Sequence, residues 1–422
     1  MGTILLNGDK PVLRFNLDFG EYQILNRDLL PFTLRNKIEE PIQLNEMSSK
    51  ADIQKAVVTS VRNLDYIQSF FASRVLPLTR ENAKKIYSLF FFEQAQDDHS
   101  KALIAITCRA VSLQDNFWVK DENDPVEWKD VNLRHQHLSE TVAQVALHGS
   151  SLTLQGKEHT PELNGQGAYP KAWKREEDGL YLYKLGSHGT EDAARIEVAV
   201  SNILDKTNVP HVRYLEAESQ GIYACKCKCL TDDDHSILPG MDFRTFCTTE
   251  GKSPELEILK IDSDMIYKMW IVDYLISNRD RHGMNWGLYY DANTMQIQKC
   301  HPLFDHNNAF DVELMKDKEA RYLYDPNYSM IEAAKYAMKK VDFAFSEPVK
   351  RSDFLTIEQF ESFCDRAGDL GLKVQERTVS ATKEGKTSSF TKAVKRAVSM
   401  AKGKEKDSEK AEGTNVKGKD NR

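Results

Sequence analysis

The residues NRDRHGMNW at positions 278–286, followed by HPLFD at positions 301–305, decide the fold that we expect for this chain. Asp280 and Asn285 are five residues apart, so one loop can present both side chains to the same cleft. Asp305 ends the next predicted strand, where it can face them. Phosphoryl transfer requires a carboxylate beside the acceptor hydroxyl and oxygen ligands that hold Mg²⁺ against the phosphates. Each residue alone is typical of a simple turn, but their order and spacing together indicate a metal–phosphate cleft.

A mainly helical region is expected around this stretch. Residues 262–277 place apolar side chains at helical spacing just before the loop. Residues 285–290 and 297–303 indicate a hairpin. Further helices are expected at 330–340 and 357–366.

A smaller β-rich segment lies upstream. Residues 180–185 alternate as a strand and carry Lys184, residues 191–206 fit a helix that carries Glu197, and residues 221–230 fit another strand. A Lys on such a strand either reaches solvent at a sheet edge or binds phosphate, and kinases tether a phosphate-binding Lys to a Glu on the following helix. Glu197 has the right position for this role, although a solvated helix position would also suit it.

The loop NGQGAYPK at positions 164–171 precedes these strands. The small residues Gly165 and Gly167, with Gln166 between them, would let backbone N–H groups approach phosphate oxygens, and Lys171 would add a positive charge. A Gly-x-Gly pair alone is also typical of an ordinary turn. Its place before a strand with an inward Lys favours a phosphate-covering loop.

Residues 1–150 are expected to form a separate accessory unit. Residues 4–6 and 12–17 flank a turn at Asn7-Gly8, which predicts an opening hairpin. Helical periodicity is present over 49–71 and again over 80–92. The aromatic residues in a polar stretch are interpreted as local packing anchors; they are Phe117, Trp118 and Trp128.

The motif Asp-Arg-His-Gly-Met-Asn at 280–285, with Pro-Leu-Phe-Asp at 302–305, resembles the catalytic and metal motifs of the HipA-type bacterial Ser/Thr kinases. The loop is also similar to the Asp-Arg-His-x-x-Asn of the phosphoinositide kinases. The resemblance implies that Asp280 is the catalytic acid/base and that His282 supports the catalytic loop. It further implies that Asn285 and Asp305 take part in catalysis as Mg²⁺ ligands.

The same resemblance implies a nucleotide site. ATP phosphates would lie under the 164–171 loop, and the segment from Lys228 to Leu230 would form the hinge against the adenine. The loop contains no Ser or Thr, whereas HipA carries a self-phosphorylated Ser there, so autoinhibition by that route is not expected. The implied nucleotide-binding residues are Gly165, Gln166, Gly167, Lys171, Lys184, Glu197, Lys228 and Leu230.

Charge is distributed unevenly along the 422 residues, whose net charge is −7. From Glu376 to Arg422 there are thirteen Lys or Arg against seven Asp or Glu, a net charge of +6, which leaves −13 for the rest. An acidic body argues against nucleic-acid binding over the whole surface, although the Lys-rich tail could touch nucleic acid non-specifically. The tail is expected to be disordered. Its residues 390–398 have amphipathic spacing, which indicates either a transient helix or a membrane or partner contact.

Cysteine usage and hydropathy indicate a cytoplasmic protein. The seven cysteines are an odd number and are expected to be reduced thiols. No export signal and no transmembrane segment is expected. Cys225, Cys227 and Cys229 would share one face of a strand, which fits a buried thiol face better than a zinc site because a fourth ligand is missing.

Together these features predict an α+β, two-lobed, protein-kinase-like fold. Its parts would be an accessory α/β domain at 1–150, a small lobe at 151–232, a large helical lobe at 233–375 and a flexible tail at 376–422. The expected activity is ATP- and Mg²⁺-dependent phosphorylation of a protein Ser or Thr, in a toxin–antitoxin or stress-response setting with a possible antitoxin or regulatory partner. A lipid kinase, a nucleotide-binding pseudokinase and, less favoured, a metal nuclease remain alternatives.

Overall fold

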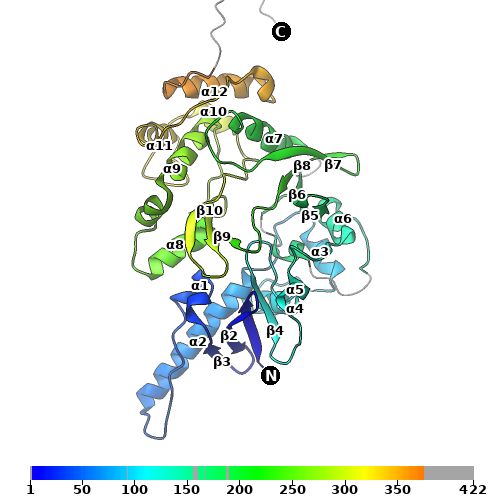
Figure 1. The fold of residues 1–422 in the computed structure, drawn as a ribbon, viewed down its shortest axis with the longest axis vertical. Helices are drawn as coiled ribbons and strands as arrows, with labels where there is room; N and C mark the ends of the chain where they lie inside the picture. Colours follow the sequence, from blue (N-terminus) through cyan, green and yellow to red (C-terminus); the bar gives the residue numbers. More distant parts are fainter. Residues whose placement is uncertain (1, 93, 155–159, 166, 187–189, 375–422) are drawn as a thin grey trace, which may run out of the picture. The chain divides into compact units, whose positions relative to one another are not determined.

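The N-terminal hairpin forms where the apolar alternation places it. Strands β1 (Thr3–Asn7) and β2 (Lys10–Asn16) pair antiparallel, and Gly8 in the turn has a φ of 57°, which glycine adopts without a steric penalty. Strands β3 (Glu21–Ile24) and β4 (Phe117–Asp121) complete an antiparallel sheet in the order β3-β2-β1-β4. Phe117 and Trp118 on β4 are buried, as packing anchors should be. Figure 1 shows this sheet close to the helix α2 (Lys50–Ala72).

The computed structural model describes residues 2–92, 94–154, 160–165, 167–186 and 190–374. Met1–Gln375 form one compact unit, and the predicted boundaries near residues 150 and 232 lie inside it and stay predictions. The predicted disordered tail and its amphipathic segment lie outside the described residues. The remaining helices of the N-terminal region are η1 (Arg27–Leu29), α1 (Phe32–Arg35), α3 (Ala83–Leu89), α4 (Asp98–Thr107), α5 (Trp128–Val131) and α6 (Glu140–His148).

A second antiparallel sheet, in the order β5-β6-β8-β7, forms the predicted β-rich segment. The helix α7 (Asp192–Leu204) packs its apolar side on one face of this sheet, against Cys225 and Cys227 among others. Both thiols are buried and Cys229 is half-buried, so the buried thiol face is confirmed. The strands are β5 (Lys171–Glu176), β6 (Gly179–Leu185), β7 (Tyr214–Ser219) and β8 (Ile222–Lys228), and the short helix η2 (Pro161–Asn164) precedes them.

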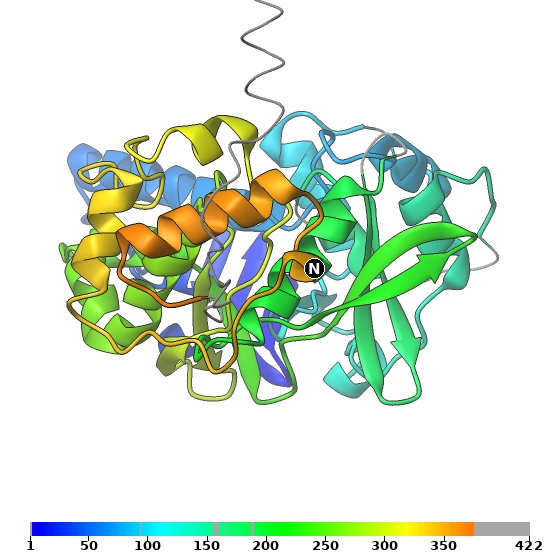
Figure 2. The same cartoon turned by 90° about the horizontal axis from the view of Figure 1, so that it is seen from above.

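The C-terminal part is mainly helical, as predicted. Its small sheet has the order β11-β10-β9, in which β10 and β11 are the predicted hairpin and β9 is a third strand that the sequence did not indicate. Figure 2 shows α12 lying across the helical part, with the strands of the β5–β8 sheet beside it. The elements are β9 (His235–Pro239), α8 (Gly240–Thr249), α9 (Pro254–Leu275), β10 (Gly287–Asp291), β11 (Ile297–Cys300), α10 (Val312–Lys316), α11 (Met330–Ala337), η3 (Arg351–Asp353) and α12 (Ile357–Asp369).

The largest differences from the predicted helix boundaries are in α3 and α9, and both have physical reasons. The helix expected over 80–92 covers only α3, because Asn82 adopts a left-handed conformation with a φ of 65°. The helix expected from Asp262 starts at Pro254 but is kinked at Asp262, whose carboxylate accepts a hydrogen bond from the backbone N–H of Met265 at 3.1 Å. Asp262 therefore caps the second part of α9, which is the part that the sequence pattern indicated.

One hydrophobic core runs through all three regions. The side chain of Asn7 donates to the carbonyl of Ala292 at 2.8 Å, and Phe32 packs edge-on against Tyr290. The N-terminal region is thus built onto the rest of the unit. Across the described part of the chain, none of the helices combines the length and apolar character that crossing a membrane would require.

Candidate active site

The 280–285 motif follows the C-terminal end of α9, where a buried ion pair fixes it. Arg281 and Asp273 are both fully buried, and a guanidinium nitrogen lies 2.9 Å from the carboxylate. The hydroxyl of Tyr322 donates to the same carboxylate at 2.6 Å. Arg281 also donates to the backbone carbonyls of Asn285 and, at 3.2 Å, Phe304. One arginine thereby joins the 280–285 loop to the segment that carries Asp305. Sequence reasoning missed this pair.

The Asp280 carboxylate faces a group of amides. It accepts hydrogen bonds from the side-chain nitrogens of Asn308 at 2.9 Å and Asn285 at 3.4 Å. Asn285 also donates to the backbone carbonyl of Asp280 at 2.8 Å, which closes the loop on itself. His282 lies with its ring nitrogen 3.5 Å from the other carboxylate oxygen and accepts the backbone N–H of Met284 at 3.1 Å. These contacts hold Asp280 in place while leaving its side chain about one-third exposed (32%).

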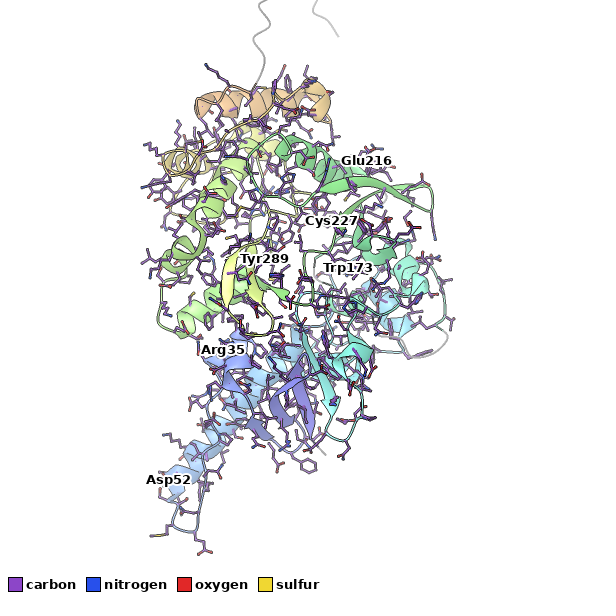
Figure 3. The ribbon with its side chains drawn as sticks, in the orientation of Figure 1. Arg35, Asp52, Trp173, Glu216, Cys227 and Tyr289 are labelled. Carbon is purple, nitrogen blue, oxygen red and sulfur yellow. The ribbon has the colours of Figure 1, made fainter. Side chains whose placement is uncertain are left out.

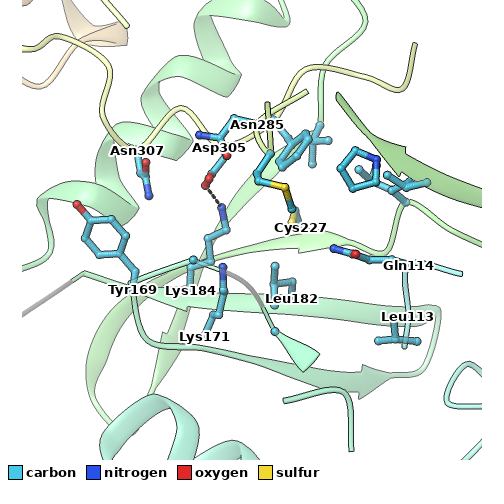
Figure 4. A pocket seen from close by; sticks show the side chains of 18 of the residues that line it. Leu113, Gln114, Tyr169, Lys171, Leu182, Lys184, Cys227, Asn285, Asp305 and Asn307 are labelled. Atoms are coloured by element: carbon cyan, nitrogen blue, oxygen red, sulfur yellow. Dashed lines mark hydrogen bonds and ion pairs between the residues drawn. The ribbon is translucent and has the colours of Figure 1, made fainter. Parts of the chain in front are cut away.

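Lys184 connects the small sheet to the Asp305 segment. Its ammonium group lies 2.7 Å from the carboxylate of Glu197. It also lies 2.7 Å from the carboxylate of Asp305 (Figure 4). The hydroxyl of Tyr214 lies 3.0 Å from the same nitrogen. The strand β6 is flanked by β5 and β8, so Lys184 is not an edge-strand charge that reaches solvent. Glu197 is only 1% exposed and accepts the backbone N–H of His306 with its other oxygen, so it is not a solvated helix position.

The charges around Asp305 reinforce one another. Burial alone would raise the pKa of Asp305, but the ammonium groups of Lys184 and Lys171 outweigh it and hold this pKa below its usual range. Burial alone would lower the pKa of Lys184, but Asp305 and Glu197 keep it well above its ordinary value. Asp305 has a φ of 60°, a strained conformation for a residue other than glycine. Strain and a fully charged buried pair are both typical of functional sites.

The 164–171 loop is attached to the N-terminal region, which the sequence did not indicate. The backbone N–H of Glu81 donates to the carbonyl of Ala168 at 2.9 Å. Arg80 is 3% exposed and donates to the carbonyls of Gly165, at 3.4 Å, and Lys171. A Cβ added to Gly165 would lie 2.2 Å from the Arg80 guanidinium, so glycine is required there for the arginine to approach.

Lys171 lies directly opposite Lys184 in the pairing of β5 and β6. Burial and, to a smaller extent, the adjacent positive charge of Arg80 lower the pKa of Lys171 to about 7, although Asp305 partly offsets them. A Cβ added to Gly167, whose φ is 91°, would lie 2.5 Å from the Lys171 ammonium nitrogen. Glycine therefore allows the lysine to lie under the loop. Arg80, Lys171 and Lys184 thus place three basic side chains at this end of the site, where Glu197 and Asp305 offset part of their charge.

These groups surround one cavity of about 900 Å³, which is within the size range of small-molecule sites. Its other end is mainly apolar and is lined by Leu182, Cys227 and Ile237. Leu113 and Gln114 of the N-terminal region also line that end (Figure 4). The predicted site residues that line the cavity are Gly165, Gly167, Lys171, Lys184, Lys228, Leu230, Asp280, His282, Asn285 and Asp305.

Two predicted residues differ from this group. Glu197 reaches the cavity only through Lys184. Gln166 lies outside the described residues. Lys228 lines the cavity, and its ammonium nitrogen lies 3.3 Å from the Asp178 carboxylate. The roles assigned to all these residues stay predictions.

The oxygen groups near Asp305 fit a hard divalent cation. Asp305 and Asn285 both line the cavity, and the side-chain oxygen of the neighbouring Asn307 is buried without a hydrogen-bond partner. A buried amide oxygen without a partner is costly unless something binds to it. Among the described residues, no three His, Cys, Asp or Glu side chains gather as a metal site, so a cation here would depend on amide oxygens. Such oxygens suit Mg²⁺.

Comparisons with known proteins gave structural similarities only. No known family profile and no curated protein matches the sequence. HipA of the Shewanella oneidensis MR-1 toxin–antitoxin system, solved with HipB and operator DNA, is 11% identical, with a TM-score of 0.44 over 88% of this chain and 98% of that chain. The Helicobacter pylori proinflammatory kinase CtkA is 13% identical, with a TM-score of 0.34 over 49% of this chain and 90% of that chain.

Because both TM-scores lie below 0.5, the fold assignment rests on the elements of this chain. A Lys on a central strand pairs with a Glu on the following helix, and a loop Asp and Asn face a third acidic residue across one cavity. This is the arrangement of parts that protein kinases use. The chain therefore has the α+β, kinase-like fold that its sequence predicted.

Proposed function

We propose that this chain is an ATP- and Mg²⁺-dependent phosphotransferase that phosphorylates Ser or Thr hydroxyls of a protein. The observation that carries the proposal is the ammonium group of Lys184, which contacts both Glu197 and Asp305 inside the cavity that Asp280 and Asn285 also line. A cation tethered to a buried Glu, next to acidic and amide oxygens, is what binding a metal–triphosphate requires.

The residues that line the cavity would bind different parts of the metal–nucleotide. Lys184 and Lys171 would contact phosphate oxygens, and the 164–171 loop would cover them with backbone N–H groups. Asn285 and Asp305, with the unpartnered oxygen of Asn307, would hold Mg²⁺. Bound Mg²⁺ would neutralise charge on the phosphates. Lys184 would turn from Asp305 toward a phosphate while Glu197 retains its ammonium group.

In the reaction, the acceptor hydroxyl oxygen forms a bond to the γ-phosphorus, and the bond from that phosphorus to the β–γ bridging oxygen breaks. ADP carries away the bridging oxygen. The hydroxyl proton passes to the carboxylate of Asp280. Asn308 and Asn285 hold that carboxylate by hydrogen bonds at 2.9 and 3.4 Å, so it would be oriented before the acceptor arrives.

Labelled phosphate transfer tests the proposal. The purified chain is incubated with γ-labelled ATP, Mg²⁺ and a protein extract whose own kinases have been inactivated by heat. We expect labelled phosphoserine or phosphothreonine with the wild type and none with Asp280→Asn. The variant should still bind ATP, because Asp280 acts on the acceptor. Equal labelling by both proteins would refute the assigned role.

The same reagents separate the alternatives. A lipid kinase would label phosphoinositide vesicles instead of protein, although the acidic body offers little basic surface for a membrane. A pseudokinase would bind ATP and label neither. A nuclease would nick plasmid DNA with Mg²⁺. The site favours a kinase over a nuclease because its parts serve a triphosphate.

The resemblance to the HipA-type kinases also suggests a protein that binds the chain and holds it inactive, as an antitoxin does. A protein encoded beside this chain could be co-expressed and tested for co-purification. If the proposal holds, labelling falls as this protein is added; an unchanged signal would exclude it as an inhibitor.

A further inference from the structure

Tyr169, in the 164–171 loop, has no packing role that would explain it. Its side chain is half-buried and lines the cavity. Within the described part of the chain, it belongs to none of the hydrophobic clusters, and its hydroxyl has no hydrogen-bond partner. A tyrosine that serves the fold usually buries its ring in a core and pairs its hydroxyl. This side chain is therefore available to a ligand in the cavity.

The backbone on both sides of Tyr169 is held in place. The carbonyl of Ala168 accepts a backbone N–H of the N-terminal region at 2.9 Å, and the carbonyl of Pro170 accepts the N–H of Leu185 at 3.0 Å. The proline also favours an extended backbone at the residue before it. Side chains two positions apart in an extended segment lie on the same side. Tyr169 and Lys171 accordingly both line the cavity.

The ring of Tyr169 extends from the loop toward Asn307 (Figure 4). Burial and then the negative charges of Asp305 and Asp280 raise the pKa of its hydroxyl, so both carboxylates lie near it. An ordinary phenol has a pKa of about 10. With this value raised further, the hydroxyl stays protonated at neutral pH and can donate a hydrogen bond.

The proposed reaction defines where the γ-phosphate must lie. Asp305 would hold Mg²⁺ against the phosphates, and Asp280 would take the proton of the acceptor hydroxyl. The transferred phosphorus then comes between these two carboxylates, and the hydroxyl of Tyr169 is near both. A neutral donor suits this place because it bonds to a charged phosphate oxygen, which a further carboxylate would repel.

The rest of the cavity leaves this contact to Tyr169. The apolar end, lined by Leu182, Cys227 and Ile237, suits the base of the nucleotide, so an aromatic ring in the covering loop is not needed for stacking. Lysine ammonium groups act as point charges that attract any of the phosphates. A donor near the acceptor side would contact the last phosphate only.

We propose that the hydroxyl of Tyr169 donates a hydrogen bond to a non-bridging oxygen of the γ-phosphate, and that this bond lets the site distinguish ATP from ADP. The bond would hold the γ-phosphate in the orientation that the acceptor hydroxyl attacks. ADP lacks the γ-phosphate and cannot form the bond, which favours its release after transfer. This inference rests on the phosphotransferase function proposed above.

Calorimetry of the full chain with Mg²⁺ tests the contact, using ADP and the β,γ-imido analogue of ATP, which is not turned over. In Tyr169→Phe, which removes only the hydroxyl, affinity for the analogue should fall about tenfold, because a hydrogen bond to a charged group is lost. Affinity for ADP should stay the same. The turnover number of phosphate transfer should fall as well.

Tyr223→Phe is the matched control. It removes a hydroxyl that lies 3.3 Å from the Glu216 carboxylate at an exposed site. Neither residue lines the cavity, and Figure 3 shows Glu216 on β7. Both nucleotide affinities should equal those of the wild type. Urea unfolding of Tyr169→Phe should also match the wild type, because the lost hydroxyl has no partner among the described residues.

The possible results separate this inference from the proposed function. The same ratio of the two affinities in Tyr169→Phe and in the wild type would overturn the inference and leave the phosphotransferase standing. A wild type that binds neither nucleotide would overturn both. Phosphate found by mass spectrometry on Tyr169 itself, after incubation of the wild type with ATP, would make the hydroxyl an acceptor and would also overturn the inference.

Discussion

The ammonium group of Lys184 contacts two carboxylates from different parts of the chain, Glu197 on α7 and Asp305 after β11. Lys184→Met should leave the buried Glu197 and the partly exposed Asp305 without a counter-charge, at a cost of about 3 kcal/mol of unfolding free energy. Urea unfolding at neutral pH measures this loss of unfolding free energy. Lys226→Met removes a partly buried pair with Glu176 on the other face of the sheet and should cost at most about 1 kcal/mol. Equal losses in both variants would contradict the bridging role.

Lys171 makes the site sensitive to pH. Its pKa in the free protein is about 7, because burial and then Arg80 disfavour its charge. A bound phosphate would favour the charged form and raise this pKa, so the complex holds more protons than the free protein above pH 7. Affinity for ATP should therefore fall as the pH rises through 7. Calorimetric titration of ATP binding from about pH 6 to 9 tests this. ATP itself also titrates in this range, so the contribution of Lys171 is the part of the pH dependence that Lys171→Met should remove. The same slope of ATP affinity against pH in the wild type and in Lys171→Met would contradict this role of Lys171.

At the residue scale, the sequence predicted what lies close together along the chain. Asp280 and Asn285 share one loop, and Glu197 follows Lys184 by thirteen residues, so spacing alone could indicate both pairs. Arg80 contacts a loop that starts more than eighty residues later, and no local pattern marks it. Arg281 was visible in the motif, but its burial against Asp273 depends on tertiary packing.

At the scale of elements, the position of the 280–285 loop depends on the end of α9. Asp273→Asn leaves the Arg281 guanidinium buried with a neutral partner and should cost about 3 kcal/mol or more of stability. Because Arg281 also holds the carbonyls of Asn285 and Phe304, the turnover number should fall while ATP affinity changes less. Phosphate-transfer kinetics and denaturant unfolding measure the two effects.

Glu257→Gln is the matched control, because it neutralises an acid in an exposed pair with Lys260 on the same helix. It should change neither stability nor turnover measurably. A normal turnover number in Asp273→Asn would show that the buried pair is structural only.

Elements with a clear period were predicted, and those defined by tertiary contacts were missed. The strands β6 and β8 and the helices α2, α7 and α12 follow strong alternation or helical spacing. The strand β9 has five residues and is defined by its pairing with β10. No pattern in the sequence indicated α8, which directly follows β9.

At the scale of the whole described unit, the N-terminal region is part of the site. Arg80 and Glu81 hold the 164–171 loop, and Leu113 and Gln114 line the opposite end of the cavity. A change in the N-terminal region would therefore move the loop that we expect to cover the phosphates.

Arg80→Ala tests this connection. Loss of the hydrogen bonds from a buried guanidinium to the loop should weaken ATP binding by about tenfold or more, with little change for adenosine, which lacks phosphates. Calorimetry with both ligands measures the ratio. Arg14→Ala removes an exposed ion pair with Glu122 of the same region and should leave both affinities unchanged. Equal weakening of ATP and adenosine would show that Arg80 supports the fold and not the loop.

A structure of the full chain with a non-hydrolysable ATP analogue and Mn²⁺, located by its anomalous signal, tests the central claim most directly. We predict the metal within about 2.0–2.3 Å of oxygens of Asn285 and Asp305. The phosphates should lie beside Lys184, and the γ-phosphate should face Asp280. A nucleotide bound elsewhere, or a metal that contacts neither residue, would contradict the phosphotransferase assignment.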